Sequence, residues 1–274
     1  MSRIVQRFKT LKADGRKALI PYFTAGDPDP ESTLDLMHAL VDAGADLIEL
    51  GVPFSDPMAE GPVIQLACER ALKHEVSLRD VMALVAAFRQ KDSDTPVILM
   101  GYLNPVEVMG YREFANEAAA AGVDGVLIVD MPPEEGAEPI DIFKQAGLDL
   151  IFLAAPTSTP ERLQKIAAAS SGFVYYVSLK GVTGAKSLDV NAVKSKLEDV
   201  RRYVDLPVGV GFGIKTADDA AAIASVADAV VVGSAIVQHI ADNQHDVSLI
   251  KSKITDLLSS MREAMDRVSR ESIE

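Results

Sequence analysis

Short apolar runs recur along the whole chain, and each is followed by a segment in which apolar residues repeat with helical spacing. The runs are rich in β-branched side chains and do not alternate with polar residues, which is typical of strands buried on both faces of a parallel sheet. There are eight of them, at 18–23, 46–50, 96–102, 125–130, 150–155, 172–179, 207–212 and 229–234. The helical segments include 30–44, 62–74, 111–122, 139–147, 159–170 and 216–228.

Eight strand–helix units predict an α/β fold, an eight-stranded parallel (β/α)8 TIM barrel. Three of the strands follow the same Ala-Gly pair or its equivalent, in DAGADLIEL, AAGVDGVLIVD and QAGLDLIFLAA. The glycine in each indicates a left-handed residue that ends the preceding helix. An open doubly wound sheet is the alternative, although it usually has fewer strands. No Pro/Ser/Gly-rich linker interrupts the pattern, so we expect one domain over 1–274.

The two ends of the chain carry helical patterns outside the eight units. Residues 1–13 place Ile4, Val5, Phe8 and Leu11 on one helical face, which predicts an extra helix covering the underside of the barrel. An organelle presequence or a membrane-surface helix is the alternative, but the segment runs straight into a strand. Residues 247–270 predict a long final helix that closes the barrel or binds a partner.

Composition excludes several classes of function. The net charge of −13 would repel a phosphate backbone, so nucleic-acid binding is not expected. Cys68 is the only cysteine, which forbids an intrachain disulfide and fits a reducing compartment. The four histidines lack metal-ligand spacing, and no apolar run is long enough to span a membrane. We therefore expect a cytoplasmic protein without a metal site.

Glycine-bearing loops follow the last three predicted strands, at 179–187, 209–216 and 231–237. Barrel enzymes place their active sites at the carboxyl ends of the strands, and their phosphate sites in the loops after strands seven and eight. Backbone N–H groups in such loops approach an anion closely, and a helix N-terminus adds its positive dipole end. The pattern predicts a phosphate site.

One carboxylate stands inside an apolar strand, in IELGVPFSDPMAEGP (48–62). Glu49 is flanked by apolar residues near the strand end, where partial burial would raise its pKa into the range used for proton transfer. Asp56 and Glu60 lie in the proline-rich loop that follows, where acids are usually solvated.

Several motifs together resemble the tryptophan synthase alpha subunit family. They are PYFTAGDP, ELGVPFSDPMAEGPVIQ, ILMGYLNP, GVTGA, GVGFGI and VVGSAIV, in this order, and they span nearly the whole chain. The resemblance implies a lyase that cleaves indole-3-glycerol phosphate to indole and glyceraldehyde 3-phosphate. It also implies a pyridoxal-phosphate-dependent beta subunit as partner in an alpha2beta2 heterotetramer, and no cofactor in this chain.

The resemblance assigns roles to particular residues. Glu49 matches the family's general acid and base, and Glu60 matches the acid that accepts the indole N–H, although aspartate is the familiar residue there. The implied substrate pocket comprises Tyr22, Met100, Leu127, Leu153, Tyr175, Thr183 and Phe212. The implied phosphate contacts are Gly184, Gly213, Gly233 and Ser234. The loops 53–62 and 178–190 would be mobile, with Asp56 and Pro57 facing the beta subunit.

Three other interpretations remain open. A free-standing lyase of the same fold would release indole without a partner. A non-catalytic subunit would activate its partner only. Another phosphate-binding barrel enzyme would need other acid–base pairs and would lack the PFSDPMAEGP loop.

Overall fold

The computed structural model describes residues 2–177, 190–211 and 213–271. Within them the helices are α1 Arg3–Ala13, α2 Pro30–Asp42, α3 Pro62–Leu72, α4 Leu78–Phe88, α5 Leu103–Met109, α6 Tyr111–Ala121, α7 Ala137–Gln145, α8 Pro160–Ala169, α9 Val190–Val200, α10 Ala217–Ala224, α11 Ser234–Asp242 and α12 Val247–Glu271. The strands are β1 Ala18–Thr24, β2 Ile48–Gly51, β3 Val97–Gly101, β4 Gly125–Ile128, β5 Asp149–Leu150, β6 Leu153–Ala154, β7 Val174–Val177, β8 Val208–Gly211 and β9 Ala229–Val232.

All pairings between these strands are parallel, in the order β5-β4-β3-β2-β1-β9-β8-β7-β6. The two ends of this order, β5 and β6, are consecutive in the chain and are separated only by Ile151 and Phe152. Ile151 N–H donates to Val126 O at 3.0 Å, and Tyr175 N–H donates to Phe152 O at 3.1 Å. One segment therefore pairs with β4 through its first half and with β7 through its second half, so the sheet closes into the predicted barrel.

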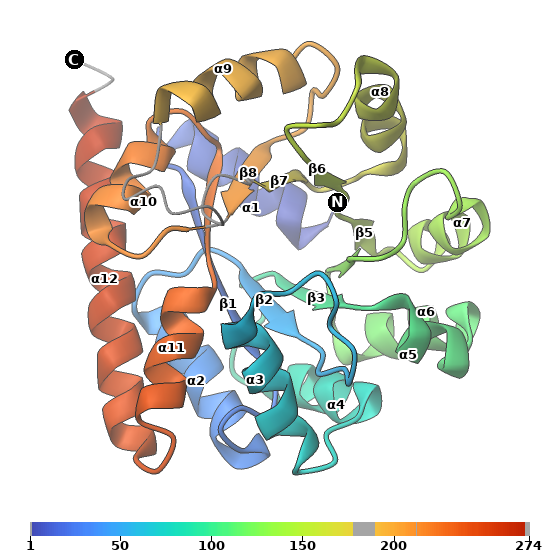
Figure 1. The fold of residues 1–274 in the computed structure, drawn as a ribbon, viewed down its shortest axis with the longest axis vertical. Helices are drawn as coiled ribbons and strands as arrows, with labels where there is room; N and C mark the ends of the chain where they lie inside the picture. The colour runs from blue at the N-terminus through green and yellow to red at the C-terminus, as the bar shows by residue number, and fades with distance from the viewer. Residues whose placement is uncertain (1, 178–189, 212, 272–274) are drawn as a thin grey trace.

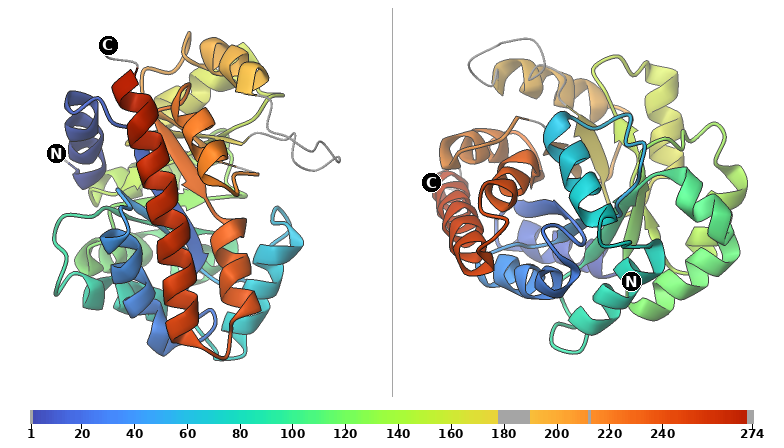
Figure 2. Two further views of the ribbon diagram at one scale, coloured as in Figure 1. Left: turned by 90° about the vertical axis from the view of Figure 1, so that its left-hand side faces the viewer. Right: turned by 60° about the horizontal axis from the view of Figure 1, so that its bottom comes forward.

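Helices surround the strands (Figure 1). The long helix α12 runs beside α10, α11 and α2, as the views of Figure 2 also show. The glycines that were predicted to end helices do so: Gly44, Gly122 and Gly147 have φ of +104°, +86° and +84°. The sequence pattern did not single out α4, α5 or α9.

Two layers of apolar side chains make up the core. One fills the space between the sheet and the helices. The other lies inside the barrel and contains Ile20, Leu47, Ile98 and Phe173 together with Ile4, Phe8 and Leu11 of α1. Because α1 contributes three buried side chains to the interior cluster, this helix supplies one end of the barrel's own core.

Polar anchors fix the amino-terminal ends of the strands. Three aspartates, each just before or at the start of a strand, accept an N–H from the neighbouring strand and pair with an arginine. They are Asp46 with Leu19 N at 2.9 Å and Arg262, Asp124 with Val97 N at 2.8 Å and Arg89, and Asp228 with Val208 N at 3.0 Å and Arg201.

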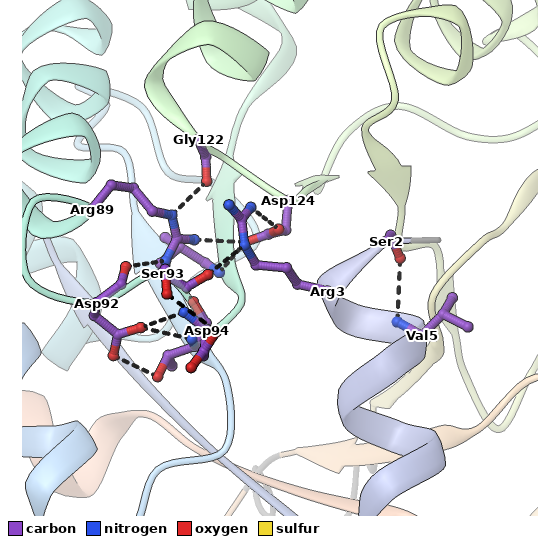
Figure 3. A network of polar contacts seen from close by, with 11 residues as sticks. Ser2, Arg3, Val5, Arg89, Asp92, Ser93, Asp94, Gly122 and Asp124 are labelled. Carbon is purple, nitrogen blue, oxygen red and sulfur yellow. Dashed lines mark hydrogen bonds and ion pairs between the residues drawn. The ribbon is translucent and has the colours of Figure 1, made fainter.

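Asp124 has the largest share of these contacts (Figure 3). Its carboxylate accepts hydrogen bonds from Arg89 Nη2 at 2.6 Å and from Arg3 Nη1 at 2.8 Å. Arg3 is the first residue of α1, so this carboxylate ties the N-terminal helix to the base of β4. Its side chain is 4% exposed and that of Arg89 is 10% exposed, so removing either partner would leave a buried charge unpaired.

We expect Asp124→Ala to lower the free energy of unfolding by about 3 kcal/mol or more. It removes the carboxylate that pairs with the buried charge of Arg89 and that accepts the Val97 N–H. Arg79→Ala, which removes an exposed ion pair to Glu113 and Glu117, should change it little. Urea unfolding of both variants checks this. Equal losses would contradict the anchoring role of Asp124.

Candidate functional site

Glu49 lies in the middle of the barrel wall and faces its interior. In β2 it is in register with Tyr22 of β1 and Ile98 of β3. Its side chain lies deeper than the sequence suggested: the residue is only 1% exposed, and Oε1 has no hydrogen-bond partner among the described residues. Desolvation, with a smaller contribution from the charge of Glu60, raises the pKa of Glu49 from 4.5 to about 8.

Glu60 lies at the end of the loop between β2 and α3 and is half-buried rather than solvated. Desolvation raises its pKa from 4.5 to about 7. The Glu60 N–H donates to Pro57 O at 3.0 Å, closing a tight turn just before α3 begins at Pro62. The charge of Glu60 raises the pKa of Glu49, so the two carboxyl groups interact electrostatically.

Two tyrosines flank this acid pair. Burial raises the pKa of both Tyr22 and Tyr175 well above the usual value, and the charges of Glu49 and Glu60 add to the rise. The Tyr175 hydroxyl lies over Gly211, where a Cβ would overlap it. The Tyr22 hydroxyl lies over Gly51, where a Cβ would meet it at 2.5 Å. Glycine at these two strand positions makes room for the tyrosine rings.

Apolar residues expected in the pocket come together in the interior cluster of the barrel. Leu127 is fully buried in the interior cluster, and Met100, Leu153 and Tyr175 are half-buried against that cluster. Met100 is in register with Leu127, and Leu153 with Tyr175. Leu127 is therefore enclosed by its neighbours, whereas the other three side chains keep part of their surface exposed.

The expected phosphate residues lie in the segments that follow β8 and β9. Gly233 immediately precedes α11, and Ser234 is the first residue of that helix. Ile236 and Val237 donate to Gly233 O, whereas the N–H groups of the first helical residues have no acceptor within a helix. Gly213 has φ of +79°, a conformation that glycine adopts readily. A Cβ at Gly233 would lie 3.3 Å from the ring of Tyr22, so this helix start adjoins one of the two tyrosines that flank the acid pair.

Other expected residues lie outside this cluster or outside the described part of the chain. Asp56 is exposed and accepts a hydrogen bond from Ser55 Oγ at 2.6 Å, and Pro57 is half-buried. Both lie in the same loop as Glu60, next to Met58, which is 82% exposed. Thr183, Gly184 and Phe212 lie outside the described residues, as does nearly all of the 178–190 loop.

Sequence reasoning overlooked Tyr102, which contacts the loop that carries Glu60. Its hydroxyl accepts a hydrogen bond from Ala59 N–H at 3.0 Å, and its ring stacks on Phe54 at 5.3 Å. The motif ILMGYLNP did point to this residue. Positions 98, 100 and 102 would lie on the same face of an extended strand, and position 102 is aromatic.

Among the described residues, no group of three or more histidine, cysteine, aspartate or glutamate side chains is arranged to hold a metal ion. In the same part of the chain, no helix is both long and apolar enough to cross a membrane. The described residues bring two carboxyls, tyrosine hydroxyls and backbone N–H groups to this site. They suit proton transfer next to a bound anion.

Comparison with known proteins identifies close relatives of the chain. The family model described as "Tryptophan synthase alpha chain" matches residues 8–266. The tryptophan synthase alpha chain of Thioalkalivibrio sulfidiphilus is 62% identical over 266 residues, covering 97% of this chain and 100% of the relative. That of Nitrosococcus oceani is 62% identical over 267 residues, covering 97% and 98%.

Solved structures agree over the same length. Tryptophan synthase subunit alpha from Legionella pneumophila is 47% identical, with a TM-score of 0.92 over 97% of this chain and 99% of that one. A chain of tryptophan synthase from M. tuberculosis, in an aminoacrylate-bound form, is 37% identical with a TM-score of 0.86, covering 97% and 100%.

We expect burial of Glu49 to make stability depend on pH. The folded chain holds the proton with a pKa near 8 and the unfolded chain with one near 4.5. The favourable binding of this proton therefore contributes fully to the free energy of unfolding below pH 4.5. The contribution is lost as the pH rises toward 8. The free energy of unfolding of Glu49→Gln, relative to that of the unaltered chain, should therefore rise by about 2–4 kcal/mol between pH 5.5 and pH 8.5. Urea unfolding of both proteins at the two pH values measures this difference. A constant difference would contradict the raised pKa.

Proposed function

The chain belongs to the tryptophan synthase alpha chain family, and we propose that Glu49 and Glu60 carry the bond cleavage that this family performs. As a member it is the indole-3-glycerol-phosphate lyase subunit of tryptophan synthesis and works with a beta subunit. The observation that carries our proposal is the burial of Glu49 beside a second carboxyl group.

The cleavage is a retro-aldol reaction and needs three things. Carbon 3 of the indole ring must gain a proton, the hydroxyl on the neighbouring carbon of the glycerol chain must lose one, and the indole N–H must be stabilised as positive charge develops. The bond between the two carbons then breaks, leaving indole and the aldehyde of glyceraldehyde 3-phosphate.

Glu49 suits the two proton transfers. With a pKa of about 8 it holds a proton at neutral pH and can give it to carbon 3. The carboxylate that remains can take the hydroxyl proton, which returns Glu49 to its starting state. A strand position between β1 and β3 holds the group firmly enough for both transfers.

Glu60 suits the electrostatic role. Its pKa of about 7 is lower than that of Glu49, so it is the first of the two to ionise. Its carboxylate can accept a hydrogen bond from the indole N–H, and its negative charge also keeps Glu49 protonated. Two acids of one type thus take different roles because one is more deeply buried than the other.

The remaining contacts follow from their places around this pair. Met100, Leu127, Leu153, Tyr22 and Tyr175 supply the apolar surround of the indole ring. Gly213, Gly233 and Ser234 offer N–H groups to the phosphate, and Thr183, Gly184 and Phe212 are assigned to the same site by the resemblance alone. Asp56 and Pro57 lie in the Glu60 loop, where contact with the beta subunit would couple binding to the position of Glu60.

The steps assigned here call only for proton transfer and charge stabilisation, which the carboxyl groups provide. We therefore propose that pyridoxal phosphate serves the beta subunit, in an alpha2beta2 assembly. We also propose a cytoplasmic location.

Activity with and without an added beta subunit tests these roles. We expect Glu49→Gln to lower kcat by about 100-fold or more, because it removes the proton donor and acceptor. Glu60→Gln should cost about 100-fold through the lost charge, whereas Glu60→Asp, which keeps the charge, should cost much less. Indole release from indole-3-glycerol phosphate is the measurement.

The controls separate the alternatives. Each variant should still activate the beta subunit, which shows that it folds and binds. Fast indole release without a partner would instead identify a free-standing lyase. No release by the unaltered chain, with normal activation of the beta subunit, would leave a non-catalytic activator.

The phosphate contact has a matched pair of glycines. Gly213 and Gly147 have φ of +79° and +84°, and a Cβ on either would meet no atom of the described residues within 4 Å. Alanine at either position should cost about 1–2 kcal/mol of stability through backbone strain alone. Only Gly213→Ala should also raise the KM for indole-3-glycerol phosphate, by about 5-fold or more. Equal KM values in the two variants would remove Gly213 from the phosphate site.

A further inference from the structure

The loop that carries Glu60 is fixed by side chains from outside it. Ala59, the residue before Glu60, donates its N–H to Tyr102 Oη at 3.0 Å. Gln65 Nε2, from α3, donates to Glu60 O at 2.8 Å. The backbone is therefore held on both sides of the Glu60 side chain.

Tyr102 is itself held firmly. It is 5% exposed and stands immediately before α5, and the next residue, Leu103, donates its N–H to Asp130 Oδ1 at 2.7 Å. Its ring stacks on Phe54 with ring centroids 5.3 Å apart and planes 25° apart. Phe54 lies near the start of the same loop, so one side chain contacts both ends of the segment between β2 and Glu60.

The α3 side of this frame is fixed independently. Arg70, near the end of α3, makes two hydrogen bonds to Asp27 at 2.7 and 2.8 Å, and Asp27 is fully buried. Charge-assisted pairs of this geometry are strong when shielded from water. Gln65 therefore acts from a helix that is anchored to the segment after β1.

We propose that Tyr102 is a positioning residue for Glu60, acting through the Ala59 N–H and the stack on Phe54 rather than by contact with the reacting atoms. This inference rests on the proposed role of Glu60. A glutamate side chain is longer than an aspartate, so a given change in backbone orientation at Glu60 displaces its carboxylate further. Tyr102 sets that orientation.

Tyr102→Phe is the direct test, because it removes the hydroxyl and keeps the ring that stacks on Phe54. In the complex with the beta subunit we expect kcat to fall about 3- to 10-fold, the usual effect of one lost hydrogen bond, with KM changed less than about twofold. Tyr111→Phe is the matched control, since it removes a hydroxyl that bonds to Glu107 and leaves the Glu60 loop untouched.

Coupling to Glu60 distinguishes positioning from a general loss of structure. In a Glu60→Gln background, Tyr102→Phe should no longer change kcat, because there is no charge left to position. An undiminished effect in that background would show that Tyr102 acts on the substrate or on the fold, and would overturn the proposal.

Hydrogen exchange gives a readout independent of activity. We expect the Ala59 amide to exchange faster in Tyr102→Phe than in the unaltered chain or in Tyr111→Phe. An unchanged rate would overturn the proposal, even if kcat fell. Full activity of Glu60→Gln would instead refute the proposed role of Glu60. A lower kcat in Glu60→Gln together with an unchanged kcat in Tyr102→Phe would refute only the inference about Tyr102.

Discussion

Removal of the Glu49 carboxyl group from water is the constraint on which the rest of the site depends. A carboxylate in a low-dielectric interior loses hydration that no described hydrogen bond to Oε1 replaces, so the neutral acid is favoured. The barrel provides this burial because strands pair on both sides of β2 and an apolar cluster fills the space inside. That interior exists only because the chain closes the sheet through 149–154 and because α1 packs at one end.

The second carboxyl group is held in a different way. Glu49 is fixed by the pairing of β2 with its neighbours. Glu60 is fixed by the turn from Pro57, by the Tyr102 hydroxyl that accepts the preceding N–H, and by the side-chain amide of Gln65 in α3. A strand gives accuracy without adjustment, whereas a loop held by a few contacts can be moved by a partner or a ligand. This difference fits the proposed roles: Glu49 is a proton carrier held in one place, and Glu60 supplies a charge that can be moved into place.

Local sequence predicted the features that depend on neighbouring residues. The run at 18–23 became β1, and the Ala-Gly pairs became helix ends because glycine alone accepts their positive φ at low cost. The run at 150–155 was expected to be one strand but is divided into β5 and β6, since it changes partners partway along. Glu49 stood out as a single acid in an apolar strand.

Features that depend on distant residues escaped prediction. The sequence does not show that Glu60 is half-buried, because the contacts of its loop come from distant parts of the chain. Tyr102, whose hydroxyl accepts the Ala59 N–H, lies 43 positions after Ala59. The pairing of Asp46 with Arg262 joins residues 216 positions apart, and no helical or strand period relates them. The assignment of Thr183, Gly184 and Phe212 to the site rests on the family resemblance alone.

The most direct test is a titration of the Glu49 carboxyl group itself, followed by NMR on the full chain with ¹³C-labelled glutamate side chains and assigned with Glu49→Gln. Burial of Glu49 predicts a midpoint near pH 8, above that of Glu60 near pH 7. A midpoint near 4.5, the ordinary value for glutamate, would mean that Glu49 is ionised at neutral pH and cannot be the resting proton donor.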